Sequence, residues 1–158
     1  MKSDTEKIHA LIEQYCRAAL QKDPDAMLQL YDGDVRIFDL WDRASVRGTA
    51  EWSPLVRHWL GSLGPETVHV AFEQIEVQVE RDLAVLTAFV HYQARDPAGT
   101  VLREMTNRLT WSLARREPGC RAAGSNPRLS TGPRGNALQP SLNSWRTRRT
   151  RTAVLARG

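Results

Sequence analysis

The sequence predicts an α+β domain, in which helices come first along the chain and long strands follow. Two observations lead to this class. Apolar residues recur with a helical period between residues 8 and 20, and again between residues 52 and 63. From residue 68 to residue 113 they instead alternate in three long runs that are separated by turn signals. Helical segments followed by a meander of strands are typical of an α+β fold rather than of repeated βαβ units.

The first helix has a clear start and a clear buried face. Ser3 and Glu6 have the capping-box spacing, which satisfies two free backbone donors where a helix begins. Apolar residues then follow one helical stripe: Ile8, Leu11, Ile12, Tyr15, Cys16, Ala19 and Leu20. Tyr15 is therefore expected on the inward face of this helix.

Shorter elements connect this helix to the long strands. Asp23 and Pro24 indicate the cap and first position of a second, short helix that runs to about Tyr31. Residues 35–40 and 44–47 read as strands, with 32–34 as a turn before them. A third helix is expected from about residue 49 to residue 63, where Gly64 and Pro65 end it.

The long strands show three further features. Alternation changes phase at Glu73 and Gln74, as one inserted residue in a β-bulge would cause. The run at 83–92 is apolar on one face and partly apolar on the other, which indicates a second covered surface, a homodimer interface through the sheet. Residues 96–99 read as a hairpin turn before the last strand, which ends near residue 113.

Charge divides the chain into two unlike parts. Residues 1–114 carry 12 Lys and Arg against 17 Asp and Glu, whereas residues 115–158 carry 10 Arg and one acid, Glu117. We therefore expect one domain over residues 1–117 and an Arg-rich tail of low order over 118–158. Three interpretations stay open for the tail: an arm for nucleic acid, which its scattered arginines argue against, a solvated segment, or a frameshift near Gly119 that replaced a final strand.

Other classes of function find no support in the residues. Cys16 and Cys120 form no disulfide framework, and His9, His58 and His69 have no metal-ligand spacing. No glycine-rich phosphate loop is present, so we expect neither a metal nor a cofactor. The start of the chain has no signal-peptide pattern and no apolar run could span a bilayer, so we expect a cytoplasmic protein without a membrane contact.

Two stretches of the sequence resemble a known group of proteins. The text "LIEQYCRAALQKDPDAMLQLYDGDVRIFD" and the later "LREMTNRLTWSL" are similar to the opening and the fifth strand of the nuclear transport factor 2-like superfamily. This superfamily includes ketosteroid isomerases and SnoaL-like polyketide cyclases, and the resemblance covers roughly residues 8–113. It implies a cone-shaped, curved mixed or antiparallel sheet packed on a long N-terminal helix and two shorter helices.

The resemblance to ketosteroid isomerases also implies a site. Tyr15 matches their oxyanion tyrosine, Asp39 matches their general base, and Asn107 stands where they have a second, protonated oxyanion donor. The implied function is an isomerase, dehydratase or cyclase acting on an apolar carbonyl compound. The alternative is a non-catalytic module for ligand binding or dimerisation. Tyr15 could equally be a core residue, and Asp39 a strand-end acid paired with a nearby arginine.

The residues themselves favour a pocket beside the last strand. Asn107 and Arg103 interrupt its apolar face, and buried polar side chains need partners. The expected partner is an apolar small molecule with a few polar groups that bond to these side chains. We expect its wall to include Trp41, Trp59, His91, Arg103, Met105 and Trp111, although Trp59 has the helical spacing of an ordinary core residue.

Overall fold

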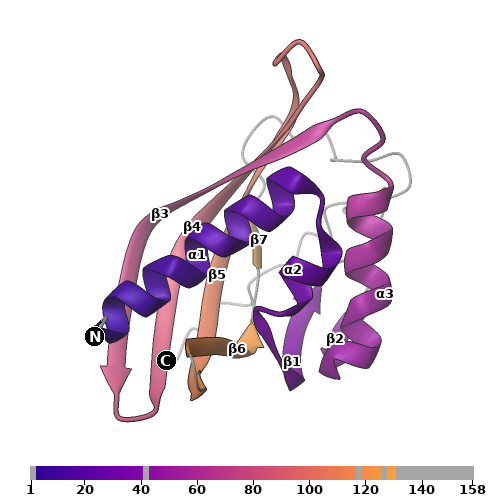
Figure 1. Ribbon diagram of the computed structural model, residues 1–158. Helices are drawn as coiled ribbons and strands as arrows, with labels where there is room; N and C mark the ends of the chain where they lie inside the picture. The colour runs from indigo at the N-terminus through magenta and orange to yellow at the C-terminus, as the bar shows by residue number, and fades with distance from the viewer. Residues whose placement is uncertain (1–2, 41–42, 117–118, 126–127, 131–158) are drawn as a thin grey trace, which may run out of the picture.

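The computed structural model describes residues 3–40, 43–116, 119–125 and 128–130. Three helices occur among these residues: α1 (Asp4–Gln21), α2 (Pro24–Leu28) and α3 (Gly48–Gly61). The strands are β1 (Tyr31–Leu40), β2 (Arg43–Arg47), β3 (Thr67–Glu80), β4 (Leu83–Arg95), β5 (Val101–Arg116), β6 (Gly119–Ser125) and β7 (Arg128–Ser130). Figure 1 shows their arrangement, with the long strands β3, β4 and β5 side by side.

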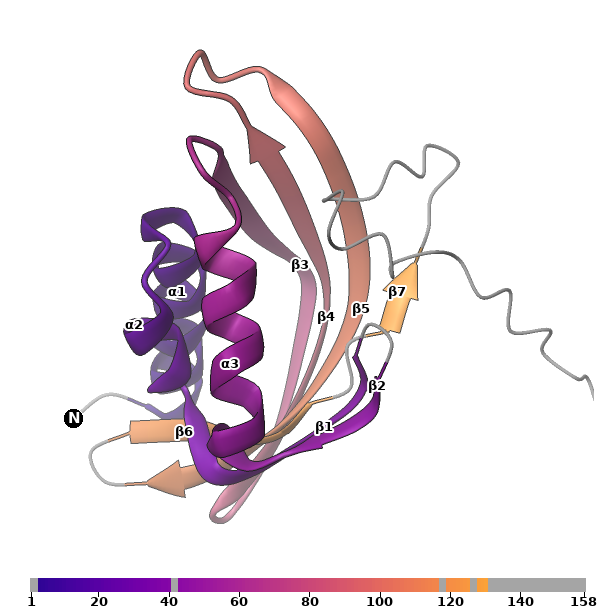
Figure 2. The same ribbon diagram turned by 90° about the vertical axis from the view of Figure 1, so that its right-hand side faces the viewer.

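The described strands form one mixed sheet in the order β2-β1-β6-β5-β4-β3, with β7 paired to β5 beyond this path. All pairs are antiparallel except β1 with β6, which are parallel. The sheet is curved, and all three helices cover its concave side (Figure 2). We call this side the inner face and the opposite side the outer face. The predicted α+β class, with a curved mixed sheet and three helices, is confirmed.

Local sequence signals account for where α1 and α2 begin. In α1 the Ser3 hydroxyl accepts from the Glu6 amide at 3.2 Å, and the Glu6 carboxylate accepts from the Ser3 amide at 2.6 Å. In α2 the Asp23 carboxylate accepts from the Ala26 amide at 3.0 Å, with Pro24 in the first helical position. Both predicted caps are confirmed.

Strand β3 contains the predicted β-bulge. The register between β3 and β4 shifts between Glu73 and Glu76, and Gln74 between them has a φ of 50°. One extra residue on β3 therefore forms a β-bulge, which restores the apolar side chains beyond it to the inner face. The predicted phase change at Glu73 and Gln74 is confirmed.

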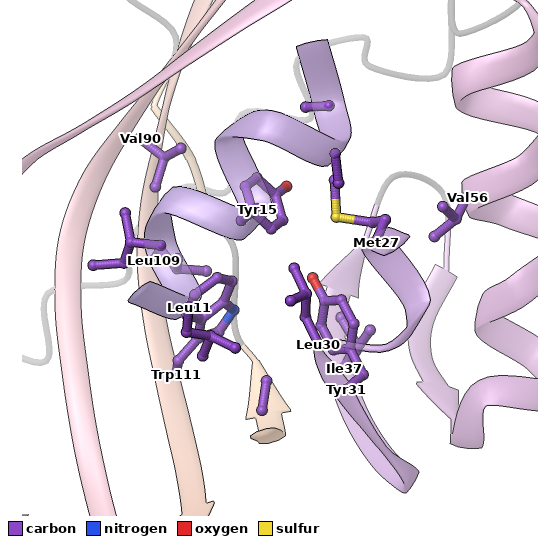
Figure 3. Packing of buried hydrophobic residues seen from close by; sticks show 14 of the residues in the cluster. Leu11, Tyr15, Met27, Leu30, Tyr31, Ile37, Val56, Val90, Leu109 and Trp111 are labelled. Atoms are coloured by element: carbon purple, nitrogen blue, oxygen red, sulfur yellow. The ribbon is translucent and has the colours of Figure 1, made fainter. Parts of the chain in front are cut away.

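Strand β4 shows the two faces most clearly. Its even-numbered residues from Ala84 to Ala94 are all buried against the helices, and its odd-numbered residues lie on the outer face with more exposure. The inner core contains a cluster of aromatic rings around Trp111, which is 2% exposed (Figure 3). None of the described helices is long and apolar enough to cross a membrane.

An ion pair joins the start of the chain to the end of β5. The two guanidinium Nη atoms of Arg115 each donate to one carboxylate oxygen of Asp4 at 2.7 Å. Arg115 Nε also lies 3.2 Å from the Asp82 carboxylate in the turn between β3 and β4. Three separate segments are thereby held together at one end of the sheet.

The structure differs from the expectation that order ends at residue 117. Residues 119–125 form β6, which pairs with β5 on one side and with β1 on the other. Ala122 in β6 is 1% exposed, and its amide donates to the Leu30 carbonyl at 2.9 Å. Backbone groups of β1 and β5 need partners whatever side chains the intervening segment carries, so composition alone misled the prediction. The frameshift stays a prediction, and residues 131–158 lie outside the described residues.

Candidate functional site

The inner face holds a pair of tyrosine hydroxyl groups. Tyr15 Oη, from the middle of α1, lies 2.8 Å from Tyr92 Oη on β4, and both side chains are buried. Tyr15 is buried, as the helical stripe predicted, and Figure 3 shows its ring beside α1 among the other labelled core residues. Tyr92 was not among the predicted site residues. Its inward position follows from strand alternation, but its contact with Tyr15, 77 residues away, has no signal in the sequence.

Aromatic rings enclose this pair. The Tyr15 ring packs edge-on against Phe72 and Trp111, with centroids 5.7 and 5.5 Å apart. The Tyr92 ring meets Trp59 of α3 in the same manner at 6.2 Å. Edge-to-face contacts of this kind fix the ring planes, and so they fix the directions in which the two hydroxyl groups point.

Burial keeps both hydroxyl groups protonated. The loss of hydration raises the pKa of Tyr15 well above its usual range, and the neighbouring Tyr92 raises it further. Burial also raises the pKa of Tyr92, although the hydrogen bond to Tyr15 opposes that change. Two protonated hydroxyl groups share one hydrogen bond between them, so one O–H of the pair stays available as a donor to a third group.

Asn107 adds a polar group on the same face. It is 5% exposed, and its Oδ1 is buried and accepts no hydrogen bond from a described residue. Its neighbour across the ladder is Val90, whereas Tyr92 lies opposite Met105, so Asn107 and Tyr92 are diagonal neighbours on the inner face. The sequence predicted a donor at this position, but the atom that lacks a partner among the described residues is an acceptor, Oδ1.

Two other predicted wall residues, Arg103 and Met105, lie on the same side of β5. Met105 is partly buried against the core. Arg103 forms an ion pair with Glu66, which precedes β3. The main-chain oxygens of Gly64 and Glu66 accept from Lys22 Nζ at 2.8 and 3.1 Å, so this ion pair belongs to a connected polar cluster at one end of the inner face.

The two predicted tryptophans that can be described are closely packed. Trp59 is 8% exposed beside Tyr92, and Trp111 contacts Tyr15, Tyr31 and Phe72. Trp111 is therefore a central core residue that holds Tyr15 in place. Trp41 lies outside the described residues, and so does the side chain of Asp39, whose backbone belongs to β1.

His91 corrects the predicted pocket. It is an odd-numbered residue of β4, so it lies on the outer face, away from Tyr15, Tyr92 and Asn107. There it lines a groove of about 570 Å³ that also includes Glu73 and Thr106. The prediction that His91 forms a wall together with the inner residues is therefore wrong, because alternation along a strand sends neighbouring side chains to opposite faces.

The chain resembles a known domain family in sequence. A family description of a SnoaL-like domain matches residues 8–121. This match covers more than half of the chain and extends from α1 into β6. The chain belongs to the SnoaL-like domain family. No curated protein matches it significantly in sequence.

Solved structures show the same fold. One is an NTF2-like protein with a cystatin-like fold from Novosphingobium aromaticivorans, with a TM-score of 0.68 and 23% identity, covering 89% of this chain and 88% of that one. Another is Aln2 from a Streptomyces species, with a TM-score of 0.70 and 11% identity over 79% and 89% of the two chains. A third, provisionally assigned as an aromatic ring hydroxylase from N. aromaticivorans, has a TM-score of 0.63 and 21% identity over 82% and 90%. At such identities the likeness establishes the fold alone.

Proposed function

We propose that this chain binds an apolar carbonyl compound at the inner face and catalyses acid–base chemistry on it. The tyrosine pair and Asn107 carry this proposal. An unpaired acceptor in a buried position costs roughly 1–3 kcal/mol unless a ligand or water supplies a donor. Asn107 Oδ1 is such an acceptor among the described residues, and the tyrosine pair has one hydroxyl proton to donate.

These two groups define the polar part of the ligand. The tyrosine pair would donate to a carbonyl oxygen, and Asn107 would accept from a hydroxyl or enol group elsewhere on the same molecule. The surrounding rings of Phe72, Trp59 and Trp111 suit a ligand with a flat, apolar carbon skeleton. The proposed ligand is therefore an apolar carbonyl compound that also carries a hydroxyl group.

The proposed reaction moves a proton next to the carbonyl group. Asp39 would take this proton as general base, a role implied by the family resemblance. The tyrosine pair would stabilise the oxygen on which negative charge develops, because its O–H is held in place before the reaction begins. The raised pKa of Tyr15 keeps the hydroxyl protonated, as a donor must be.

Thermal shift measurements with paired ligands test binding. Ketones, polyketides and steroids with a hydroxyl group should stabilise the protein more than the same compounds without one. Asn107→Leu removes the acceptor at similar size and should abolish this preference, which we expect to be about tenfold in Kd for one hydrogen bond. Equal affinity of the original protein for both members of each pair would contradict the assigned ligand.

Turnover is tested separately from binding. Asp39→Asn should retain ligand binding and lose isomerase, dehydratase or cyclase activity, whereas Tyr15→Phe should retain binding and lower the rate. If Asp39→Asn leaves any measured activity unchanged, Asp39 is not the base. Binding without turnover in the original protein would favour the non-catalytic alternative.

One surface supports the dimerisation alternative. Leu83, Val85 and Phe89 form a row along the outer face of β4 and are 61%, 42% and 36% exposed. Glu76 lies beside this row on β3 and Arg108 beside it on β5. A two-fold axis along the strand direction would place β3 of each copy over β5 of the other, so opposite charges would meet.

Sedimentation measures this homodimer directly. Val85→Glu places a charge in the middle of the row and should yield monomers, whereas Leu102→Glu, at an exposed apolar residue outside the row, should not. Monomers of the original protein at all concentrations would remove this alternative.

A further inference from the structure

The outer face carries a groove that the proposed function does not use. It opens where β3, β4 and β5 run side by side, and its volume is about 570 Å³. Ala71 lies directly opposite His91 in the ladder, and its small side chain leaves a hollow beside the imidazole ring. The polar side chains that line the groove are His69, Glu73, His91, Gln93, Glu104 and Thr106, with Arg95 at one end.

Three of these side chains form a hydrogen-bonded chain across the strands. Thr106 Oγ1 lies 2.7 Å from His91 Nδ1, and His91 Nε2 lies 3.0 Å from Glu73 Oε2. Thr106 is the ladder partner of His91 on β5, so the backbone register itself places the hydroxyl group beside the ring. The result is a row of hydrogen-bonded groups that runs from a hydroxyl through an imidazole to a carboxylate.

The carboxylate determines which way the hydrogen bonds run. An ionised carboxylate only accepts, so neutral His91 must carry its proton on Nε2 to donate to Glu73. Nδ1 is then a lone-pair acceptor, and the Thr106 hydroxyl must donate to it. A hydroxyl that donates to an imidazole, which is in turn oriented by a carboxylate, is the arrangement of an activated oxygen nucleophile.

A fourth residue supplies a donor near the hydroxyl. Gln93 lies diagonally across from Thr106 on the outer face, within reach for a side chain of this length. Arg95 Nη2 donates to Gln93 Oε1 at 2.8 Å, and because arginine can only donate, the Gln93 amide is oriented with its NH₂ group towards the neighbouring strand. That NH₂ group donates to Glu104 Oε2 over a long 3.3 Å, so it is weakly held there.

We propose that Thr106 accepts an acyl group from a small ester or thioester bound in this groove. Thr106 Oγ1 attacks the carbonyl carbon, and its proton passes to His91 Nδ1. The developing oxyanion accepts from Gln93 Nε2, the bond to the alcohol or thiol breaks, and His91 returns the proton to the leaving group. Water then hydrolyses the acyl-threonine by the same proton route, releasing the acid.

The site lies on the opposite face of the sheet from the tyrosine pair and adjoins the exposed apolar row, since Glu73 is the ladder partner of Phe89. Its side chains point away from Tyr15 and Asn107, which lie on the inner face. The other residues of that row, Leu83 and Val85, lie towards the start of β4, away from His91.

p-Nitrophenyl acetate on the full-length protein tests this proposal. We expect release of nitrophenol together with one acetyl group on Thr106, located by peptide mass spectrometry. Thr106→Val keeps the shape and should abolish that label. His91→Gln should slow acetylation of Thr106 by about a hundredfold, the usual contribution of a general base. Glu73→Gln removes the charge that orients the His91 ring and should slow acetylation of Thr106 less than His91→Gln does.

Thr110→Val is the matched control, because Thr110 is exposed on the same face of the same strand. It should leave acetylation of Thr106 unchanged. Acetyl groups on His91 or on lysines only, or equal labelling of Thr106 and Thr110, would overturn the proposal. Unchanged labelling of Thr106 in folded His91→Gln protein, with folding checked by its thermal transition, would overturn it as well.

Discussion

The two faces of β4 differ in what surrounds their polar groups. On the inner face Tyr92 is 8% exposed and shares its hydroxyl with Tyr15 among aromatic rings. On the outer face the next residue, His91, is half-exposed beside an open groove. Strand β4 therefore carries a buried polar residue, Tyr92, and next to it a solvent-accessible one, His91. The buried polar groups of the inner face suit selective hydrogen bonding to a bound apolar ligand. Those of the outer face are accessible to molecules in solution.

The largest expected loss of stability comes from a substitution in the aromatic cluster of the inner face, and it tests whether that face is the more rigid of the two. Trp111→Ala should lower the free energy of unfolding by about 3–5 kcal/mol, because it leaves a cavity in the centre of the aromatic cluster. Phe89→Ala on the outer face should cost much less, since that ring is already 36% exposed. Urea unfolding measures both. Equal losses would contradict the contrast between the faces.

A charge in β6 should be nearly as damaging. Ala122 is fully buried, and Ala122→Asp should destabilise the fold by about 1–3 kcal/mol or more, because the carboxyl group finds no water there. Arg121→Asp is the control, since Arg121 is exposed on the same strand. If Ala122→Asp unfolds at the same urea concentration as the control, β6 does not close the sheet in solution.

Alkaline pH should destabilise the protein through the buried tyrosines of the inner face. Burial raises the pKa of Tyr15, Tyr31 and Tyr92, which are the three tyrosines of the chain. A raised pKa in the fold means that stability from these groups is complete below about pH 10, the ordinary tyrosine pKa, and is lost as pH rises above it.

Ultraviolet titration of tyrosinate measures this effect. The native protein should show little tyrosinate at a pH where the urea-unfolded chain is largely ionised. Native ionisation of even one tyrosine near pH 10 would mean that a ring assigned to the inner face is hydrated.

Removing one hydroxyl of the inner pair should have a smaller effect. Tyr15→Phe and Tyr92→Phe should each cost about 1 kcal/mol of stability, the usual contribution of one hydrogen bond. The double variant should cost less than the sum, because each single variant already breaks the shared bond. Strictly additive losses would show that the two hydroxyl groups do not depend on each other.

The smallest effect concerns the exposed ion pair at the end of β5. The hydrogen bonds from Arg115 lower the pKa of Asp4, so this contribution is present at neutral pH and is lost as pH falls through the lowered pKa. Asp4→Asn should therefore lower the Tm slightly at pH 7, and this difference should shrink in acid. A difference that grows in acid would contradict the assigned sign.

The fold could be predicted largely because its signals are local. Ser3 with Glu6 gave the start of α1, and the phase change at Gln74 gave the bulge. Tyr15 was placed inward by helical period alone. The contact of Tyr15 with Tyr92 could not be found in this way, because it depends on how a helix crosses a sheet.

The site predictions met different outcomes, each with its own physical reason. His91 was assigned to the inner wall against the alternation of its own strand, which already placed it on the opposite face from Tyr92. Arg103 did find the partner that a buried cation needs, but that partner is Glu66 rather than a ligand. The role of Asp39 stays a prediction, because its side chain lies outside the described residues.

The position of β6 has a consequence for how the protein is made. Among the described strands, the β1–β2 hairpin joins the long strands only through β6, the segment at 119–125. The hairpin and the β3–β5 meander can each form on the ribosome, but they cannot be joined until this late segment has left the exit tunnel. Until then two open strand edges remain exposed, so a nascent chain that stalls before residue 119 should be especially prone to capture by chaperones.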